Sequence, residues 1–99
     1  MSDSPNRYLI AYDITDDKRR NRVHKYLGSF GVRAQFSVFL IDVRAVRMMR
    51  LKEKLLTMIK PEEDSILVCR IGPSTQIEPR SFEYLGKDRP MPPSGPIIL

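Results

Sequence analysis

Apolar positions in the first two thirds of the chain follow two different spacings, which predict strands and helices. Residues 7–13 (RYLIAYD) predict a strand, because apolar and aromatic side chains occupy both of its alternating faces. Residues 33–43, rich in aromatic and β-branched side chains, predict a second strand, and residues 65–71 predict a third. Since both faces of these strands are largely apolar, both faces of the resulting sheet need a cover.

Between these strands, apolar residues recur at helical spacing. Residues 16–29 predict a first helix, which Thr15 can cap and whose first turn carries two aspartates. Gly31 suits the end of that helix. Residues 44–59 predict a second helix with an apolar face, and Pro61 stops it.

The order of these elements predicts the fold class. Alternating strands and helices, followed by possible short strands at residues 75–78 and 82–86, indicate an α+β, ferredoxin-like split β-α-β sandwich. Two helices cover one face of the sheet, so a second copy of the chain is the simplest cover for the other, and we expect a homodimer. Residues 1–86 form the predicted domain, and the proline-rich residues 87–99 form an extended tail.

Composition narrows the function classes. The 99 residues suit one domain, and a net charge of +5 favours a polyanionic partner, with nucleic acid ahead of an anionic membrane. The chain shows neither a signal peptide nor an apolar run near the ~20 residues that span a bilayer, so we expect a cytoplasmic protein. A single cysteine, Cys69, excludes an internal disulfide and is expected to be a small buried hydrophobe.

Asp13 is the first residue with a chemical interpretation. It ends the first predicted strand, where it is either a turn residue or a metal ligand. A lone carboxylate holds Mg²⁺ weakly, because this ion usually takes one or two carboxylates together with waters or phosphates. If a two-fold axis passed close by, the Asp13 of a second copy would supply another carboxylate.

A group of arginines opens the first predicted helix. Arg19, Arg20 and Arg22 form either a solvated helix face or a phosphate-binding ridge, and Arg33 opens the second strand. The planar guanidinium suits the second interpretation, because it binds two phosphate oxygens at once. His24 could serve as a general base, because imidazole exchanges protons near neutral pH, but its place beside the basic residues favours an exposed helix residue.

Two motifs in this region resemble a known family. The stretch YLIAYDITDDKRRNRVHKYL followed by GVRAQFSVFL resembles the first half of the CRISPR-associated protein two family. In that family a tyrosine-aspartate pair ends the first strand, a D-x-x-R-R-like helix start follows, and the second strand carries Q-x-S-V-F. Together with EDSILVCRI, the resemblance covers residues 7–72.

The resemblance implies a ferredoxin-like homodimer in which the last strand of each chain adds to the partner's sheet. It implies that Asp13 of both subunits holds Mg²⁺ or Mn²⁺ near the two-fold axis, for metal-dependent cleavage of single-stranded RNA or duplex DNA. Asp13 and Tyr12 then match catalytic positions. The implied nucleic-acid contacts are Arg19, Arg20, Arg22 and Arg33, with Phe39 as a structural neighbour.

The resemblance also implies a partner and leaves several functions open. The partner is the CRISPR integrase: the dimer bridges two integrase dimers and holds the spacer duplex during spacer acquisition, in a bacterial or archaeal cytoplasm. Many members carry an acidic residue directly after S-V-F, where this chain has Leu40. The open functions are a metal-dependent endonuclease, a non-catalytic DNA clamp, and an RNase-type toxin of the same fold.

Overall fold

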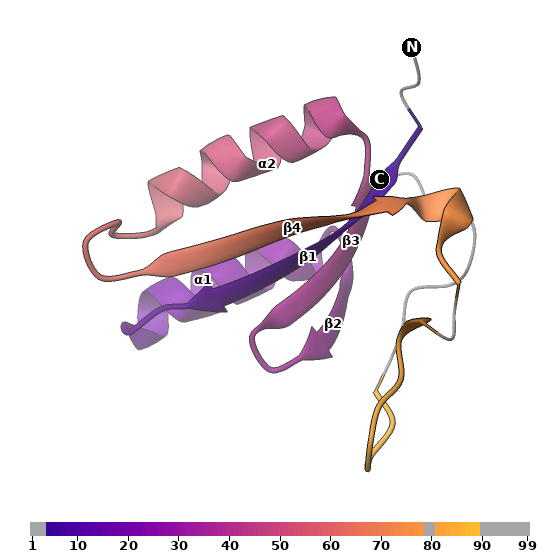
Figure 1. Ribbon diagram of the computed structural model, residues 1–99. Coiled ribbons are helices and arrows are strands. Elements are labelled where there is room, and N and C mark those ends of the chain that lie inside the picture. Colours follow the sequence, from indigo (N-terminus) through magenta and orange to yellow (C-terminus); the bar gives the residue numbers. More distant parts are fainter. Residues whose placement is uncertain (1–3, 79–80, 90–99) are drawn as a thin grey trace.

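A computed structural model describes residues 4–78 and 81–89 of the chain. The elements are, in chain order, β1 (Asn6–Asp13), α1 (Asp17–Gly28), β2 (Val32–Gln35), β3 (Val38–Val43), α2 (Ala45–Met58), β4 (Ser65–Pro73) and the 3₁₀-helix η1 (Ser74–Gln76) (Figure 1). They build a four-stranded antiparallel sheet in the order β2-β3-β1-β4. The predicted α+β, ferredoxin-like fold is confirmed.

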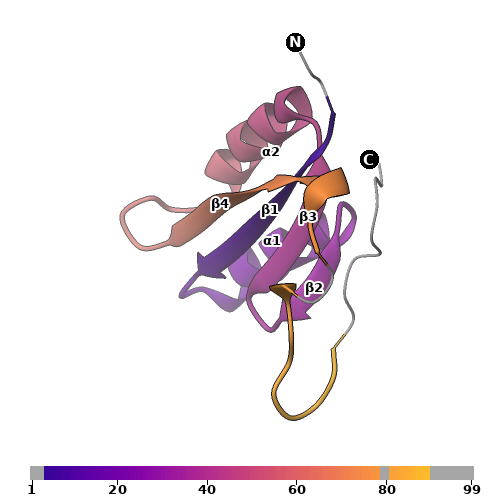
Figure 2. The ribbon, with the colours of Figure 1, turned by 45° about the vertical axis from the view of Figure 1, so that its right-hand side comes forward.

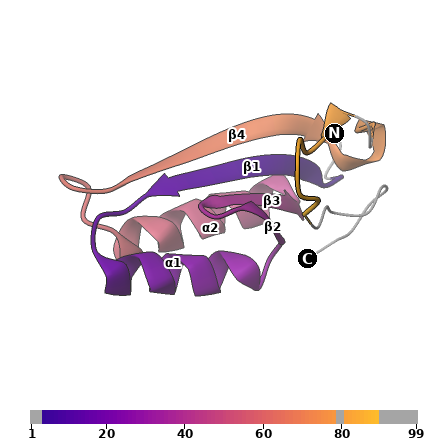
Figure 3. The same ribbon diagram turned by 90° about the horizontal axis from the view of Figure 1, so that it is seen from below.

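The two helices lie side by side on one face of the sheet (Figure 3). β1 runs through the centre and turns Tyr8, Ile10 and Tyr12 towards the helices, where each is at most 7% exposed. Apolar residues from β3 and both helices complete this core: Val23, Leu27, Phe39, Ile41, Val43, Met48, Leu51 and Leu55. In the described part of the chain, neither helix is long and apolar enough to cross a membrane.

The prediction of one continuous strand over residues 33–43 is wrong, because these residues form the hairpin of β2 and β3. Phe36 and Ser37 form the turn between β2 and β3. No glycine, proline or asparagine marks this turn, so its aromatic and β-branched surroundings predicted one continuous strand. The backbone N–H of Tyr12 donates to the Ser37 carbonyl at 3.1 Å, which fastens the turn to the end of β1.

Several predicted boundaries also change. The cap of α1 is Asp16, whose side chain accepts a hydrogen bond from the Arg19 backbone N–H at 2.9 Å. Gly31 does not end the helix in a left-handed turn; a Cβ there would lie 2.3 Å from the Leu40 carbonyl oxygen, so the residue permits close packing on β3. The expected short strands near the end are absent from the described residues 74–78 and 81–86, where η1 and irregular chain occur instead.

Among the described residues, the segment 81–84 covers one half of the second face of the sheet. Residues 81–84 pass over β2 and β3 (Figure 2), where the Tyr84 hydroxyl donates to the Ala34 carbonyl at 2.8 Å. The cover reaches Leu9 of β1, but over β4 the described chain provides none: Leu67 is 60% exposed, and Cys69 is exposed rather than buried as expected.

The expected tail depends largely on residues 90–99, which lie outside the described residues. Residues 87–89, where that tail was expected to begin, form neither helix nor strand. The boundary at residue 86 and the exchanged strand therefore stay predictions.

Candidate nucleic-acid interface

The candidate residues gather where β1 ends, beside the β2–β3 turn and the first two turns of α1. Tyr12 and Asp13 are neighbours in sequence, but successive strand residues point to opposite faces of the sheet. Tyr12 lies under α1 and is buried, whereas Asp13 belongs to the face that lacks helices and is exposed. The pair expected to act together is therefore divided between the two faces.

The Tyr12 hydroxyl is part of a small polar group within the helix-covered face. It lies 3.3 Å from His24 Nδ1 and donates to the Phe36 carbonyl at 3.5 Å. Burial raises the pKa of this phenol, and the nearby positive charges of Arg33 and Arg20 oppose that rise. Tyr12 is therefore a neutral hydrogen-bond donor at pH 7, which suits positioning rather than action as a base.

Phe39 and His24 form the apolar support of this tyrosine. Phe39 is 1% exposed, stacks on Tyr12 with 6.3 Å between ring centroids, and meets the edge of the His24 ring at 5.4 Å. Phe39 therefore lies in the core directly beside Tyr12, and its implied role near the site stays a prediction. His24 is half-buried rather than exposed, a placement that its position one turn after Arg20 and one before Leu27 could have indicated.

Two of the predicted arginines flank the tyrosine. Arg20 donates to the Ile14 carbonyl at 3.0 Å and pairs with Asp17. The guanidinium of Arg33 lies 4.9 Å from the centroid of the Phe36 ring. Both cations act on Tyr12 electrostatically, so the end of β1 carries positive charge on its helix-covered side.

Arg22 stands apart from these two. It lies two positions after Arg20, and residues at that spacing do not share a helix face. Its side chain is exposed and makes no hydrogen bond or ion pair with any residue that the structure describes. Arg22 therefore presents an available guanidinium to solvent.

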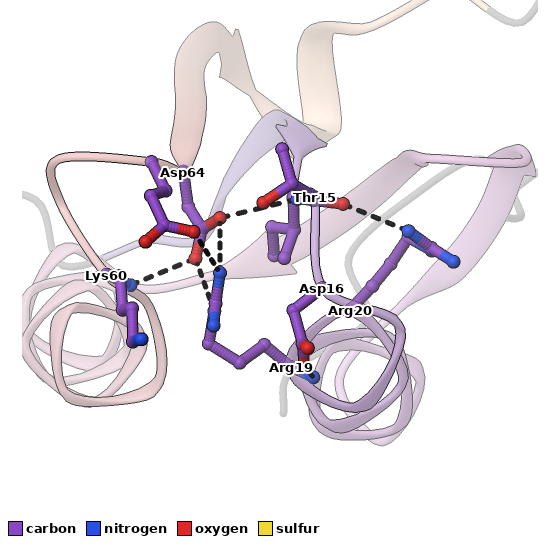
Figure 4. A network of polar contacts seen from close by, with 8 residues as sticks. Thr15, Asp16, Arg19, Arg20, Lys60 and Asp64 are labelled. Carbon is purple, nitrogen blue, oxygen red and sulfur yellow. Dashed lines mark hydrogen bonds and ion pairs between the residues drawn. The ribbon is translucent and has the colours of Figure 1, made fainter.

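Arg19 was predicted to contact phosphate, but its guanidinium already binds carboxylates of the same chain. It donates to Asp64 from Nε at 2.8 Å and from Nη2 at 3.1 Å, and to Glu63 at 3.3 Å (Figure 4). Asp64 also accepts from the backbone N–H groups of Lys60 and Thr15. These contacts lower the pKa of Asp64 to about 2, and Arg19 joins α1 to the segment before β4.

The candidate metal ligand at this end of β1 is the exposed carboxylate of Asp13. Within the described ranges, no three His, Cys, Asp or Glu residues group as a metal site, and Asp64 is held by Arg19. Leu40 pairs with Leu9 on the face of Asp13 and is 2% exposed, so it supplies no second oxygen ligand there. One carboxylate alone would hold Mg²⁺ or Mn²⁺ weakly, so Asp13 would need a second carboxylate from another copy, or phosphates and waters, to complete a site.

These features define a small, basic, ferredoxin-like α+β domain with arginines around one strand end. The family model described as CRISPR associated protein Cas2 matches residues 6–77, and the chain belongs to that family. The family resemblance predicted from the sequence is confirmed.

Individual relatives agree with this assignment. A protein of Rhodospirillum rubrum named CRISPR-associated endoribonuclease Cas2 4 is 48% identical over 63 residues, which cover 64% of this chain and about half (51%) of that relative. The crystal structure of Streptococcus pyogenes Cas2 at pH 6.5 matches with a TM-score of 0.70 and 30% identity, over 81% of this chain and 99% of that one. A chain of a partial Cas6-RT-Cas1–Cas2 complex matches with a TM-score of 0.54 and 28% identity, over 64% of this chain and 77% of that one.

Proposed function

We propose that this protein is a CRISPR adaptation subunit, a nucleic-acid-binding dimer that holds a spacer duplex and bridges two integrase dimers in a bacterial or archaeal cytoplasm. Family membership and the similarity to a chain from a Cas1–Cas2 complex support this role. The observation that carries the binding function is the exposure of Arg22 on α1 and of Arg33 at the start of β2, in a chain of net charge +5. Two copies double that charge and present the arginines of both.

The uncovered half of the sheet supplies the surface for the second copy. Leu9, Ala11, Leu67 and Cys69 share this face of β1 and β4, as their pairing register and alternation require. Leu67 is 60% exposed, and residues 81–84 lie over the other half of the sheet. An apolar sheet face left in water favours association with another copy of itself, because burial of apolar area stabilises the dimer.

Duplex binding should depend on phosphates rather than bases. Guanidinium groups on a helix and a strand edge bind phosphate oxygens, which position a duplex but carry no sequence information. Arg22→Ala with Arg33→Ala is therefore expected to weaken binding of a duplex, measured by fluorescence anisotropy, and to weaken it equally for two duplexes of unrelated sequence. A matched control removes the same charge from α2, through Arg50→Ala with Lys54→Ala. Loss of affinity in the control alone would place the binding face on α2.

A second candidate function is metal-dependent cleavage of a phosphodiester, which the printed names of relatives suggest. The exposure of Asp13 on the same face as the proposed dimer surface favours it, since a two-fold axis there would bring two carboxylates together. A bound Mg²⁺ would polarise the phosphate and lower the pKa of a water. The two Asp13 side chains would hold the ion, while Tyr12 stays on the opposite face and supports the fold.

A nuclease assay separates the two functions. Wild type and Asp13→Ala are compared on RNA and duplex DNA, with and without Mg²⁺. Cleavage that requires both Mg²⁺ and Asp13 supports the endonuclease, whereas binding without cleavage in either protein leaves the clamp as the function. The RNase-type toxin is excluded if an integrase gene lies beside this one.

A further inference from the structure

The β2–β3 turn presents an aromatic ring to solvent at the candidate interface. Phe36 is 69% exposed, whereas its neighbours Phe39 and Tyr12 are both buried. A single exposed ring is common on protein surfaces and is not a site by itself. What distinguishes Phe36 is the charge beside it and the rigidity of the turn that carries it.

The charge comes from Arg33. Its guanidinium lies 4.9 Å from the Phe36 ring centroid, within the range of a cation–π contact. The β2–β3 register shifts between Arg33 and Gln35, and this bulge changes the direction of the strand just before the turn. The ring and the planar cation therefore stand together at the edge of the sheet, and both residues are exposed.

The turn itself is held by the end of β1. The Tyr12 backbone N–H donates to the Ser37 carbonyl at 3.1 Å, and the Tyr12 hydroxyl donates to the Phe36 carbonyl at 3.5 Å. Two bonds from one buried residue thus support the two turn residues. The backbone that carries Phe36 is therefore held before any ligand arrives, which reduces the entropy that binding must offset.

We propose that Phe36 and Arg33 form a stacking platform for an unpaired base of a single-stranded nucleic acid. This inference rests on the proposed nucleic-acid-binding function and names the two side chains that would hold an unpaired base on that surface. Every base has a π-face that stacks on an aromatic ring, while arginine contributes a cation–π contact and binds the adjacent phosphate. Bases within a duplex are already stacked on each other, so the platform selects single strands.

The test distinguishes binding to bases from binding to phosphates. Wild type is titrated with a single-stranded thymidine oligonucleotide and with an abasic strand of the same length and phosphate number. The platform predicts tighter binding of the thymidine strand, and Phe36→Ala removes that preference, with a loss of about 10-fold in affinity for the thymidine strand. Leu85→Ala, which alters another exposed apolar side chain (91% exposed), leaves the preference unchanged.

A second variant reports stacking directly. The chain contains no tryptophan, so Phe36→Trp introduces a single fluorophore at the platform. Its fluorescence is expected to be quenched by the thymidine strand and not by the abasic strand. The inference is overturned if Phe36→Ala retains the preference and Phe36→Trp is not quenched. It is also overturned if Phe36→Ala dissociates the dimer in sedimentation, because Phe36 would then be an interface residue. Duplex binding is measured separately with the Arg22→Ala and Arg33→Ala variant, whereas the platform is tested by changes at Phe36 alone, so failure of the platform and failure of the proposed function are distinguishable.

Discussion

At the scale of single residues, the contacts of Arg19 and Asp64 show why a charge pattern alone misassigns an arginine. Arg19, Arg20 and Arg22 are equivalent in the sequence, as three basic residues at the start of one helix. Asp64 lies 45 positions after Arg19 and accepts hydrogen bonds from its guanidinium. No residue near Arg19 in the sequence indicates that contact. The sequence therefore predicted a basic cluster but could not distinguish Arg19, which binds Asp64, from Arg22, which is exposed.

The same pair predicts how stability depends on pH. Arg19 and two backbone N–H groups lower the pKa of Asp64 to about 2, below the ~3.9 of an unfolded aspartate. The ionised carboxylate therefore stabilises the fold fully above pH ~4, and this contribution is lost as the pH falls through about 2. Asp64→Asn should lower the free energy of unfolding at pH 7, and its difference from wild type should shrink between pH 4 and pH 2.

Glu63→Gln is the control for that series of denaturant titrations. Its carboxylate contacts the same guanidinium at 3.3 Å but is half exposed, so the change should alter stability by less than about 1 kcal/mol. A constant difference between wild type and Asp64→Asn from pH 7 to pH 2 would show that the charge of Asp64 does not stabilise the fold.

At the scale of elements, periodicity predicted both helices, β1 and β4 but missed the β2–β3 hairpin. Helical spacing and strand alternation are local properties, and α1 and α2 begin and end within one residue of the predicted bounds. The turn at Phe36 and Ser37 depends instead on the end of β1, whose backbone bonds Ser37. Arg33 and Phe36 flank that turn, so the geometry of this part of the candidate site could not be predicted from the sequence pattern.

Two glycines near the end of α1 test this packing. Gly31→Ala would place a Cβ 2.3 Å from the Leu40 carbonyl oxygen and 2.6 Å from Ile41 Cγ1, so the backbone must shift. We expect a loss of about 1–3 kcal/mol in the free energy of unfolding. Gly28→Ala meets only Phe39 Cε2, at 3.9 Å, and should be neutral or stabilising by up to about 1 kcal/mol in the same chemical denaturation series. Equal effects of the two changes would contradict this packing of α1 against β3.

At the scale of the whole molecule, the proposed function requires a second copy of the chain. The sequence indicated this from the apolar character of both sheet faces. Among the described residues, the area left uncovered on the second face centres on β4 and the adjoining part of β1. The sequence could not indicate that residues 81–84 cover the other half. The contact of Tyr84 with Ala34 joins segments that are far apart in the chain, and residues 81–84 form no regular element.

Two leucines of similar exposure test the location of the dimer surface. Leu67 on β4 is 60% exposed and Leu56 on α2 is 63% exposed. Leu67→Lys should shift the protein from dimer to monomer in sedimentation velocity, because it places a charge within the proposed interface, whereas Leu56→Lys should sediment as wild type. A dimer that survives Leu67→Lys but not Leu56→Lys would place the interface on the helix side.

The central claim is that arginines near the end of β1 bind nucleic-acid phosphates. Its most direct measurement is the salt dependence of duplex affinity, because each neutralised phosphate contributes about −0.9 to the slope of log affinity against log salt. Arg22→Ala with Arg33→Ala should flatten the slope by about 0.9 for each phosphate contact removed, while Arg50→Ala with Lys54→Ala should keep the wild-type slope. Identical slopes for wild type and the Arg22/Arg33 variant would contradict the claim.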